Sequence, residues 1–130
     1  MANKSKKSKF VWIGLAGLII IIIGIIILTN SKKVPGKYDD FAKCLKTQGV
    51  LFYGAFWCPH CQNQKALFGS SVQYLPYVEC STPDGQSQNS LCQQNNIAGY
   101  PTWVFKDGSR LSGETPLADL ASKSGCALPQ

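Results

Sequence analysis

Two cysteines separated by two residues form the part of this chain that is best suited to chemistry. The tetrapeptide Cys58-Pro59-His60-Cys61 follows the apolar run 50–53 and opens a segment with helical character. A helix N-terminus presents unpaired N–H groups and the positive end of the helix dipole, which stabilise a thiolate at Cys58. Pro59 suits the first helical turn, and His60 adds a hydrogen-bond donor that also favours the thiolate. The pattern predicts a redox-active dithiol.

Two other uses of this cysteine pair remain open. It can contribute to a zinc site together with Cys80 and Cys92, or it can form a purely structural disulfide. Cys80 and Cys92 lie twelve positions apart in the sequence, whereas the paired ligands of a zinc ribbon lie about two to four residues apart. No metal is therefore expected. Trp57 beside the pair is typical of an exposed redox rim, which favours the dithiol over a structural disulfide.

A long apolar segment precedes the cysteines. Residues 10–28 are an uninterrupted apolar run, which as a helix of nineteen residues is about 28 Å long and matches a bilayer core. The sequence therefore predicts a transmembrane helix over residues 10–29. A cleaved signal peptide is the alternative, but the run is longer than the usual apolar region of such peptides and lacks a small-residue cleavage site.

The basic residues are concentrated around this segment. Of the thirteen lysines and arginines, six lie in the first 33 positions, where there is no acid, and residues 34–130 carry seven basic and seven acidic groups. A neutral domain has no electrostatic motive to bind nucleic acid. Four lysines precede the apolar run and two follow it, which favours a cytoplasmic N-terminus and an extracytoplasmic domain, in a periplasm, a lumen or the cell exterior.

These features divide the chain into four parts. A basic cytoplasmic tail (1–9) leads into the transmembrane helix (10–29), and a linker (30–36) leads into a globular domain (37–130). All six cysteines lie in that domain, which suits an oxidising compartment.

Hydrophobic periodicity and turn residues predict the elements of the domain. In chain order they are a helix over 38–48, a strand over 50–53, the dithiol helix over 61–68, a strand over 77–80, a polar loop over 81–90, a short helix over 91–96, a hairpin over 102–105 and 110–111, and a helix over 116–123. A helix between two strands implies a parallel crossover, and the hairpin adds antiparallel strands. The fold class is α/β, with a mixed sheet flanked by helices.

Two motifs carry a resemblance to a known family. Trp57-Cys58-Pro59-His60-Cys61 and Gly99-Tyr100-Pro101-Thr102 resemble the redox motif and the cis-proline loop of the thioredoxin superfamily. More narrowly, the chain is similar to the thioredoxin-like domain that is fused to or paired with bacterial and plant homologues of vitamin K epoxide reductase. The resemblance covers about residues 38–125, and the segments that carry it are 52–65, 67–69, 77–80 and 99–103.

The resemblance implies a thiol oxidoreductase that oxidises exported cysteine-containing proteins and passes electrons to a quinone-reducing membrane partner. No cofactor is expected on this chain, since the quinone belongs to the partner, which would act in trans. Many thioredoxins keep a buried acid six residues before the first motif cysteine, where this chain has Phe52. Proton transfer at Cys61 would then rely on water, His60 or a substrate group.

The motif also suggests a role for each residue. We expect Cys58 to be the exposed, attacking thiol and Cys61 to be buried with a higher pKa. If Pro101 is cis, the backbone of Tyr100 lies opposite the dithiol and offers an edge to an extended substrate, whereas an ordinary turn proline is the alternative. Trp57, His60 and Tyr100 would form the rim, although each also has a reading as packing.

The remaining four cysteines allow several pairings. A bond between Cys80 and Cys92 would staple the polar loop between them, and a second electron-relay pair is the alternative. Cys44 and Cys126 lie in the first helix of the domain and just after its last helix. A bridge between them is one open pairing that would tie the two ends of the domain together.

Three functions follow from these readings. The first is a membrane-tethered enzyme that forms disulfides, and the second is a tethered reductase fed by a transmembrane electron donor. A histidine between the cysteines favours the first, because stabilising the reduced form makes the disulfide a stronger oxidant. The third is a non-catalytic binding module, which would be indifferent to loss of Cys58 and Cys61.

Overall fold

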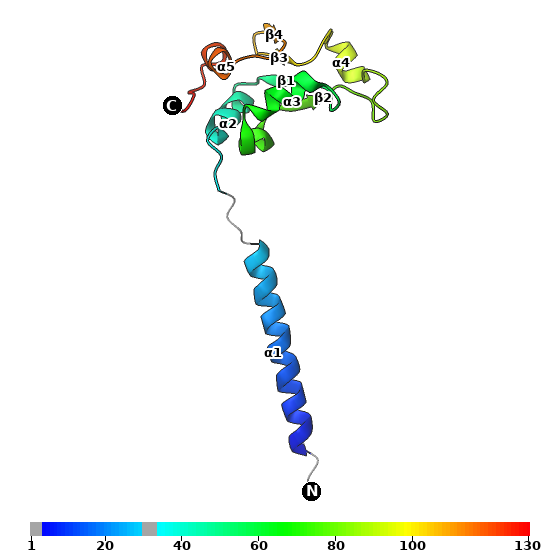
Figure 1. Cartoon of the computed structure of the whole chain (residues 1–130), viewed down its shortest axis with the longest axis vertical. Helices are drawn as coiled ribbons and strands as arrows, with labels where there is room; N and C mark the ends of the chain where they lie inside the picture. Colours follow the sequence, from blue (N-terminus) through cyan, green and yellow to red (C-terminus); the bar gives the residue numbers. More distant parts are fainter. Residues whose placement is uncertain (1–3, 30–33) are drawn as a thin grey trace. The chain divides into compact units, whose positions relative to one another are not determined.

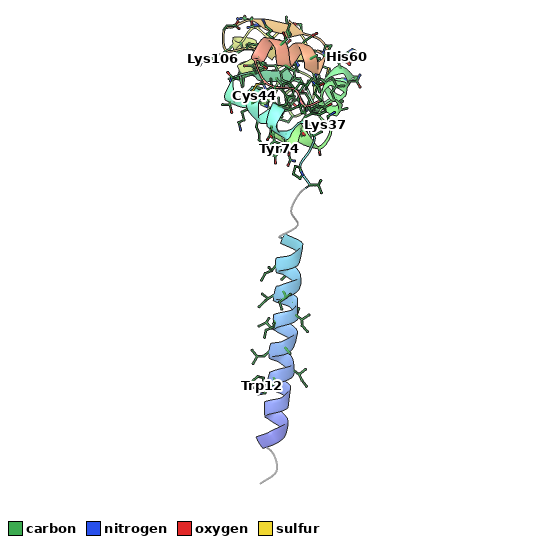
Figure 2. The ribbon with its side chains drawn as sticks, turned by 90° about the vertical axis from the view of Figure 1, so that its left-hand side faces the viewer. Trp12, Lys37, Cys44, His60, Tyr74 and Lys106 are labelled. Carbon is green, nitrogen blue, oxygen red and sulfur yellow. A yellow bond between two sulfur atoms is a disulfide. The ribbon has the colours of Figure 1, made fainter. Side chains whose placement is uncertain are left out.

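A computed structural model describes the backbone of residues 4–29 and 34–130, and the side chains of residues 12–26 and 34–130. The chain divides into two compact units, 1–34 and 35–130. The first unit consists of α1 (Lys4–Thr29), a single helix of 26 residues (Figure 1). Its described side chains are almost all exposed, Trp12 among them (Figure 2).

The predicted membrane anchor rests on this helix. Within the described parts of the chain, no helix combines the length and the apolar character that crossing a membrane requires. The anchor over residues 10–29 therefore stays a prediction. Parts of the predicted tail and linker, residues 1–3 and 30–33, lie outside the described residues.

The second unit is built on a four-stranded mixed sheet, with strand order β2-β1-β3-β4 (Figure 1). The strands are β1 (Leu51–Gly54), β2 (Tyr77–Glu79), β3 (Thr102–Val104) and β4 (Arg110–Ser112). The β1–β2 pair is parallel, and the β1–β3 and β3–β4 pairs are antiparallel. The mixed α/β fold predicted from the sequence is confirmed.

Five helical segments surround this sheet: α2 (Asp39–Thr47), α3 (Pro59–Ala66), η1 (Gly69–Tyr74), α4 (Ser90–Gln94) and α5 (Leu117–Ser124). Helix α3 begins at Pro59, directly after Cys58 as N-cap, so the predicted start at residue 61 was two residues late. The short 3₁₀ helix η1 was not predicted. Its sequence is polar and starts with a glycine, so it shows no apolar periodicity.

Neighbouring residues of β1 point to opposite faces of the sheet, and each face carries a hydrophobic cluster. Phe52 belongs to the larger one, with Trp103 stacked on its ring at 4.4 Å between centroids. Tyr53 belongs to the smaller one, with Cys80, Cys92 and Ile97. The sheet therefore positions whatever follows the end of β1, which is the segment that carries the dithiol.

Candidate active site

The dithiol lies at the N-terminus of α3, where the sequence predicts it. Cys58 is the N-cap with an extended backbone, Pro59 occupies the first turn, and Cys61 lies within the helix. Both thiols are free in the structure. Cys58 therefore stands where the first turn of α3 leaves N–H groups without partners inside the helix, although its side chain forms no capping hydrogen bond.

The two sulfurs differ in their surroundings, although less in exposure than expected. Cys61 is fully buried, and burial, which outweighs a lowering hydrogen bond with Ala55, raises the pKa of its thiol to about 12. Cys58 is only 5 % exposed. The expectation of an openly exposed Cys58 is therefore wrong in degree, because the 99–101 loop covers it.

The covering loop holds Pro101, and the Tyr100–Pro101 peptide bond is cis. The Cys58 sulfur lies 3.8 Å from the carbonyl oxygen of Tyr100. A backbone carbonyl and an attacking thiol thus share one edge of the site. An extended peptide that pairs with this backbone edge would bring its own sulfur to Cys58.

Aromatic side chains border the same edge. Trp57 is half exposed and meets the ring of Tyr100 edge to face, with 6.1 Å between centroids. Its indole nitrogen donates to the hydroxyl of Ser81 at 2.9 Å. Phe56 beside it is also half exposed. The rim is apolar and fixed in orientation, so it suits the side chains of an unfolded or extended protein segment.

His60 lies at the surface of the domain (Figure 2), with its Nδ1 2.7 Å from the carboxylate of Glu114. Asn63 donates to the same carboxylate at 3.0 Å. The hydrogen bonds from Asn63 and His60 hold the pKa of Glu114 below its ordinary value. These two contacts hold the Glu114 carboxylate against α3, beside the dithiol.

A buried glutamine fixes the loop that carries Glu114. Gln64 is fully buried in α3, and its amide donates to the carbonyl of Thr115 at 3.0 Å. The backbone N–H of Thr115 donates back to the Gln64 amide oxygen at 2.6 Å. The loop before α5 and the dithiol helix are therefore joined by a pair of buried hydrogen bonds.

The floor of the site is apolar at one point and polar at the next. Phe52 stands at the position where many thioredoxins keep a buried acid, and its ring contacts the rings of Trp103 and Tyr77. Next to it, Tyr77 donates its hydroxyl proton to Glu79 at 2.8 Å. The Tyr77 ring lies near the buried Cys61 thiol, since a β-carbon on Gly54 would stand 2.9 Å from both.

The other four cysteines form two disulfides. Cys44 is bonded to Cys126, and Cys80 is bonded to Cys92. Figure 2 labels Cys44 on α2. Cys80 and Cys92 are both fully buried, so these sulfurs are shielded from solvent in the folded domain. This burial favours the structural role over the relay.

Sequence reasoning missed Gln64, Tyr77, Glu79 and Glu114. Their contacts to the dithiol helix arise from tertiary packing, because the partners of Gln64 and Glu114 lie more than fifty positions away. Gln64, Tyr77 and Glu79 left a signal, since they stand in segments that carry the family resemblance, whereas Glu114 left none.

Two thiols at a helix N-terminus can alternate between a dithiol and a disulfide by exchange with another pair, which carries two electrons per cycle. The fold and this site define an oxidoreductase of the thiol–disulfide class.

Comparison with known proteins identifies the family. The thioredoxin family model matches residues 31–123, so the chain belongs to the thioredoxin family. The thiol-disulfide oxidoreductase LTO1 of Arabidopsis thaliana is 45 % identical over 94 residues, which are 68 % of this chain and 24 % of that protein. The thioredoxin domain-containing protein 5 homolog of Drosophila melanogaster is 32 % identical over 102 residues, 73 % of this chain and 24 % of its own length.

The chain thus spans about a quarter of the length of these curated relatives. Among solved structures, a thioredoxin from Thermus thermophilus matches with a TM-score of 0.41 and 23 % identity, over 65 % of this chain and 79 % of that one.

Proposed function

We propose that this protein is a membrane-tethered oxidase of exported protein thiols. The observation that carries the proposal is the asymmetry of the dithiol. Cys58 is the N-cap of α3 and keeps 5 % of its surface exposed, whereas Cys61 is fully buried. The Cys58 sulfur therefore reacts with a substrate thiol, and the Cys61 sulfur reacts only with Cys58.

The reaction starts from the Cys58–Cys61 disulfide. A substrate thiolate attacks the Cys58 sulfur, the bond between the two cysteines breaks, and Cys61 leaves and takes up a proton. The second substrate thiolate then attacks the substrate sulfur of the mixed disulfide. The substrate leaves with a disulfide, and the protein retains two electrons as a dithiol.

The substrate would lie along the 99–101 loop. The carbonyl of Tyr100, 3.8 Å from the Cys58 sulfur, accepts a backbone hydrogen bond from an extended segment. Trp57 offers apolar contact on the other side. Recognition through the backbone and an apolar rim depends little on the sequence of the substrate. This suits an enzyme that acts on many different proteins.

We infer the direction of electron flow from the motif. His60 stands between the two cysteines and is hydrogen-bonded to Glu114, and a histidine beside a thiolate stabilises the reduced form of a dithiol. A stabilised reduced form makes the disulfide a stronger oxidant. Among the relatives, the Arabidopsis protein is named a thiol-disulfide oxidoreductase.

The tether and the partner complete the proposal. Residues 10–29 would anchor the chain with its N-terminus in the cytoplasm and its domain outside, and a vitamin K epoxide reductase-like membrane protein would accept the electrons and pass them to a quinone. Extraction of membranes with alkaline carbonate, followed by protease treatment of sealed vesicles, tests the anchor and its orientation. A carbonate-soluble chain would contradict the tether.

The reduction potential of the Cys58–Cys61 pair tests the direction of flow. The full chain in detergent is equilibrated against glutathione buffers. A value near about −120 mV supports the oxidase, whereas one near about −270 mV supports the reductase. In parallel, Cys58→Ser should abolish oxidation of a dithiol peptide. Cys61→Ser, mixed with the disulfide form of the same peptide, should accumulate the mixed disulfide, because Cys58 attacks the peptide disulfide and the second thiol that would resolve the product is missing. Undiminished oxidation by Cys58→Ser would contradict the role of Cys58, and binding of an extended segment without any oxidation in the unmodified chain would favour the binding module.

A further inference from the structure

A polar pair on β2 lies beneath the dithiol in an otherwise aromatic floor. The hydroxyl of Tyr77 donates to Oε2 of Glu79 at 2.8 Å. The other carboxylate oxygen of Glu79 accepts the backbone N–H groups of Ser81 at 2.8 Å and Phe56 at 3.2 Å. Three hydrogen bonds therefore fix this carboxylate, and it fixes the phenol.

Because Gly54 has no side chain, the Tyr77 side chain and the buried Cys61 thiol can approach each other next to its α-carbon. A β-carbon on Gly54 would stand 2.9 Å from the Cys61 sulfur and 3.4 Å from the Tyr77 hydroxyl oxygen. The thiol and the phenol thus face the same small space above the α-carbon of Gly54. Gly54 is also the register partner of Glu79 in the parallel pair.

The charged groups around this space come from two elements. From α3, Lys65 places its ammonium nitrogen 3.4 Å from the centre of the Tyr77 ring, and its charge favours the Cys61 thiolate. The Cys58 thiol is the other α3 group, and Glu79 comes from β2. Cys61 itself is fully buried, whereas Tyr77 and Glu79 are partly exposed. Tyr77 and Glu79 therefore extend from the neighbourhood of the buried thiol toward the partly exposed surface.

We propose that Tyr77 is the proton acceptor of Cys61 and that Glu79 positions Tyr77 and receives its proton in turn. This inference deepens the proposed function, on which it rests. It also accounts for the phenylalanine at position 52, since the proton path runs through the neighbouring strand.

The step balances without any added reagent. The Cys61 thiol gives its proton to the Tyr77 oxygen while the Tyr77 hydroxyl gives its own proton to Oε2 of Glu79. The Cys61 thiolate attacks the Cys58 sulfur of a mixed disulfide, the bond to the second thiol breaks, and that thiol leaves as a thiolate. The reverse transfer reprotonates Cys61 when it is the leaving group.

The test measures the reactions of Cys58 and Cys61 as two successive kinetic phases. The reduced full chain in detergent is mixed with an aromatic disulfide such as Ellman's reagent, which releases one coloured thiolate when Cys58 attacks and a second when Cys61 resolves. We expect Tyr77→Phe and Glu79→Gln to keep the first phase. The second should slow by at least about tenfold near pH 7, because a positioned proton acceptor contributes roughly that much or more.

The pH profile distinguishes proton transfer from a structural effect. As the pH rises toward the Cys61 pKa of about 12, hydroxide ionises the thiol directly, so the rates of the variants should approach that of the unmodified chain. Tyr74→Phe is the matched control, because Tyr74 is another partly buried tyrosine with a lysine ammonium over its ring, at 4.4 Å from Lys43. Its second phase should be unchanged.

Three results would overturn the inference. They are an unchanged second phase in both variants, a slowing that is the same at every pH, and an equal slowing in Tyr74→Phe. If Tyr77→Phe does not fold, Glu79→Gln decides the question alone. A missing first phase in the unmodified chain would instead show that Cys58 is not the attacking thiol, which contradicts the proposed function itself.

Discussion

At the scale of the residue, Gly54 controls how closely the sheet approaches the dithiol. An alanine β-carbon there would lie 2.9 Å from both the Cys61 sulfur and a ring carbon of Tyr77. Neither neighbour is the end of a flexible chain, so we expect Gly54→Ala to destabilise the domain by about 1–3 kcal/mol, as overpacking of a core does. Urea unfolding of the full chain, followed by tryptophan fluorescence, measures this loss.

The control for that substitution is Gly99→Ala. No atom lies within 4 Å of the position that its β-carbon would take, so its unfolding midpoint should stay close to that of the unmodified chain. Equal midpoints for the two variants would show that the space above Gly54 is not filled by Cys61 and Tyr77.

The Glu114 carboxylate gives the site a dependence on acid. Hydrogen bonds from Asn63 and then His60 lower the pKa of Glu114 below its ordinary 4.5. Because the folded-state pKa lies below the ordinary 4.5, the carboxylate stabilises the folded domain fully above that ordinary value. This stabilisation is lost as the pH falls through the folded-state pKa. The melting temperature of the unmodified chain should therefore fall more steeply below about pH 4.5 than that of Glu114→Gln. Parallel curves would contradict this contribution.

At the scale of the element, the two disulfides close loops of very different length. Cys44–Cys126 joins α2 to the segment after α5 across 82 positions, and Cys80–Cys92 spans 12. The entropy of the unfolded chain then assigns about 4 kcal/mol to the first and about 3 kcal/mol to the second. The Cys44→Ala/Cys126→Ala variant should accordingly unfold at lower urea than Cys80→Ala/Cys92→Ala. The opposite order would show that packing around the buried Cys80–Cys92 pair outweighs loop closure.

The sequence predicted the features that depend on neighbouring residues. Pro59 marks the start of α3, and Asp107-Gly108 marks the turn between β3 and β4, where Gly108 adopts a positive φ of 79°. The approach of Glu114 to His60 spans 54 positions and is set by packing of the loop before α5. No local pattern encodes such a contact. For the same reason the sequence left the pairing of Cys44 open.

At the scale of the whole molecule, the redox state of the dithiol should change the stability of the fold. If the disulfide is a strong oxidant, the folded domain favours the dithiol over the disulfide more than the unfolded chain does. The reduced full chain should then melt at least about 5 °C higher than the oxidised one, since 1 kcal/mol corresponds to about 4–8 °C for a domain of this size. Both structural disulfides must stay intact, which the mass after alkylation verifies.

A higher melting temperature for the oxidised chain would support the reductase instead. This measurement complements the potential, because it compares folded with unfolded chain rather than the chain with glutathione.

The buried pair of hydrogen bonds between Gln64 and Thr115 has a consequence for motion. The Gln64 amide pairs with the Thr115 backbone as neighbouring strands of a sheet do. Helix α3 and residues 113–116 therefore cannot separate without leaving two donors and two acceptors without partners. The amide hydrogen of Thr115 is thereby protected from solvent by the helix that carries the dithiol. Its rate of exchange with deuterium therefore reports whether α3 shifts during a redox cycle, at a position that is not itself part of the chemistry.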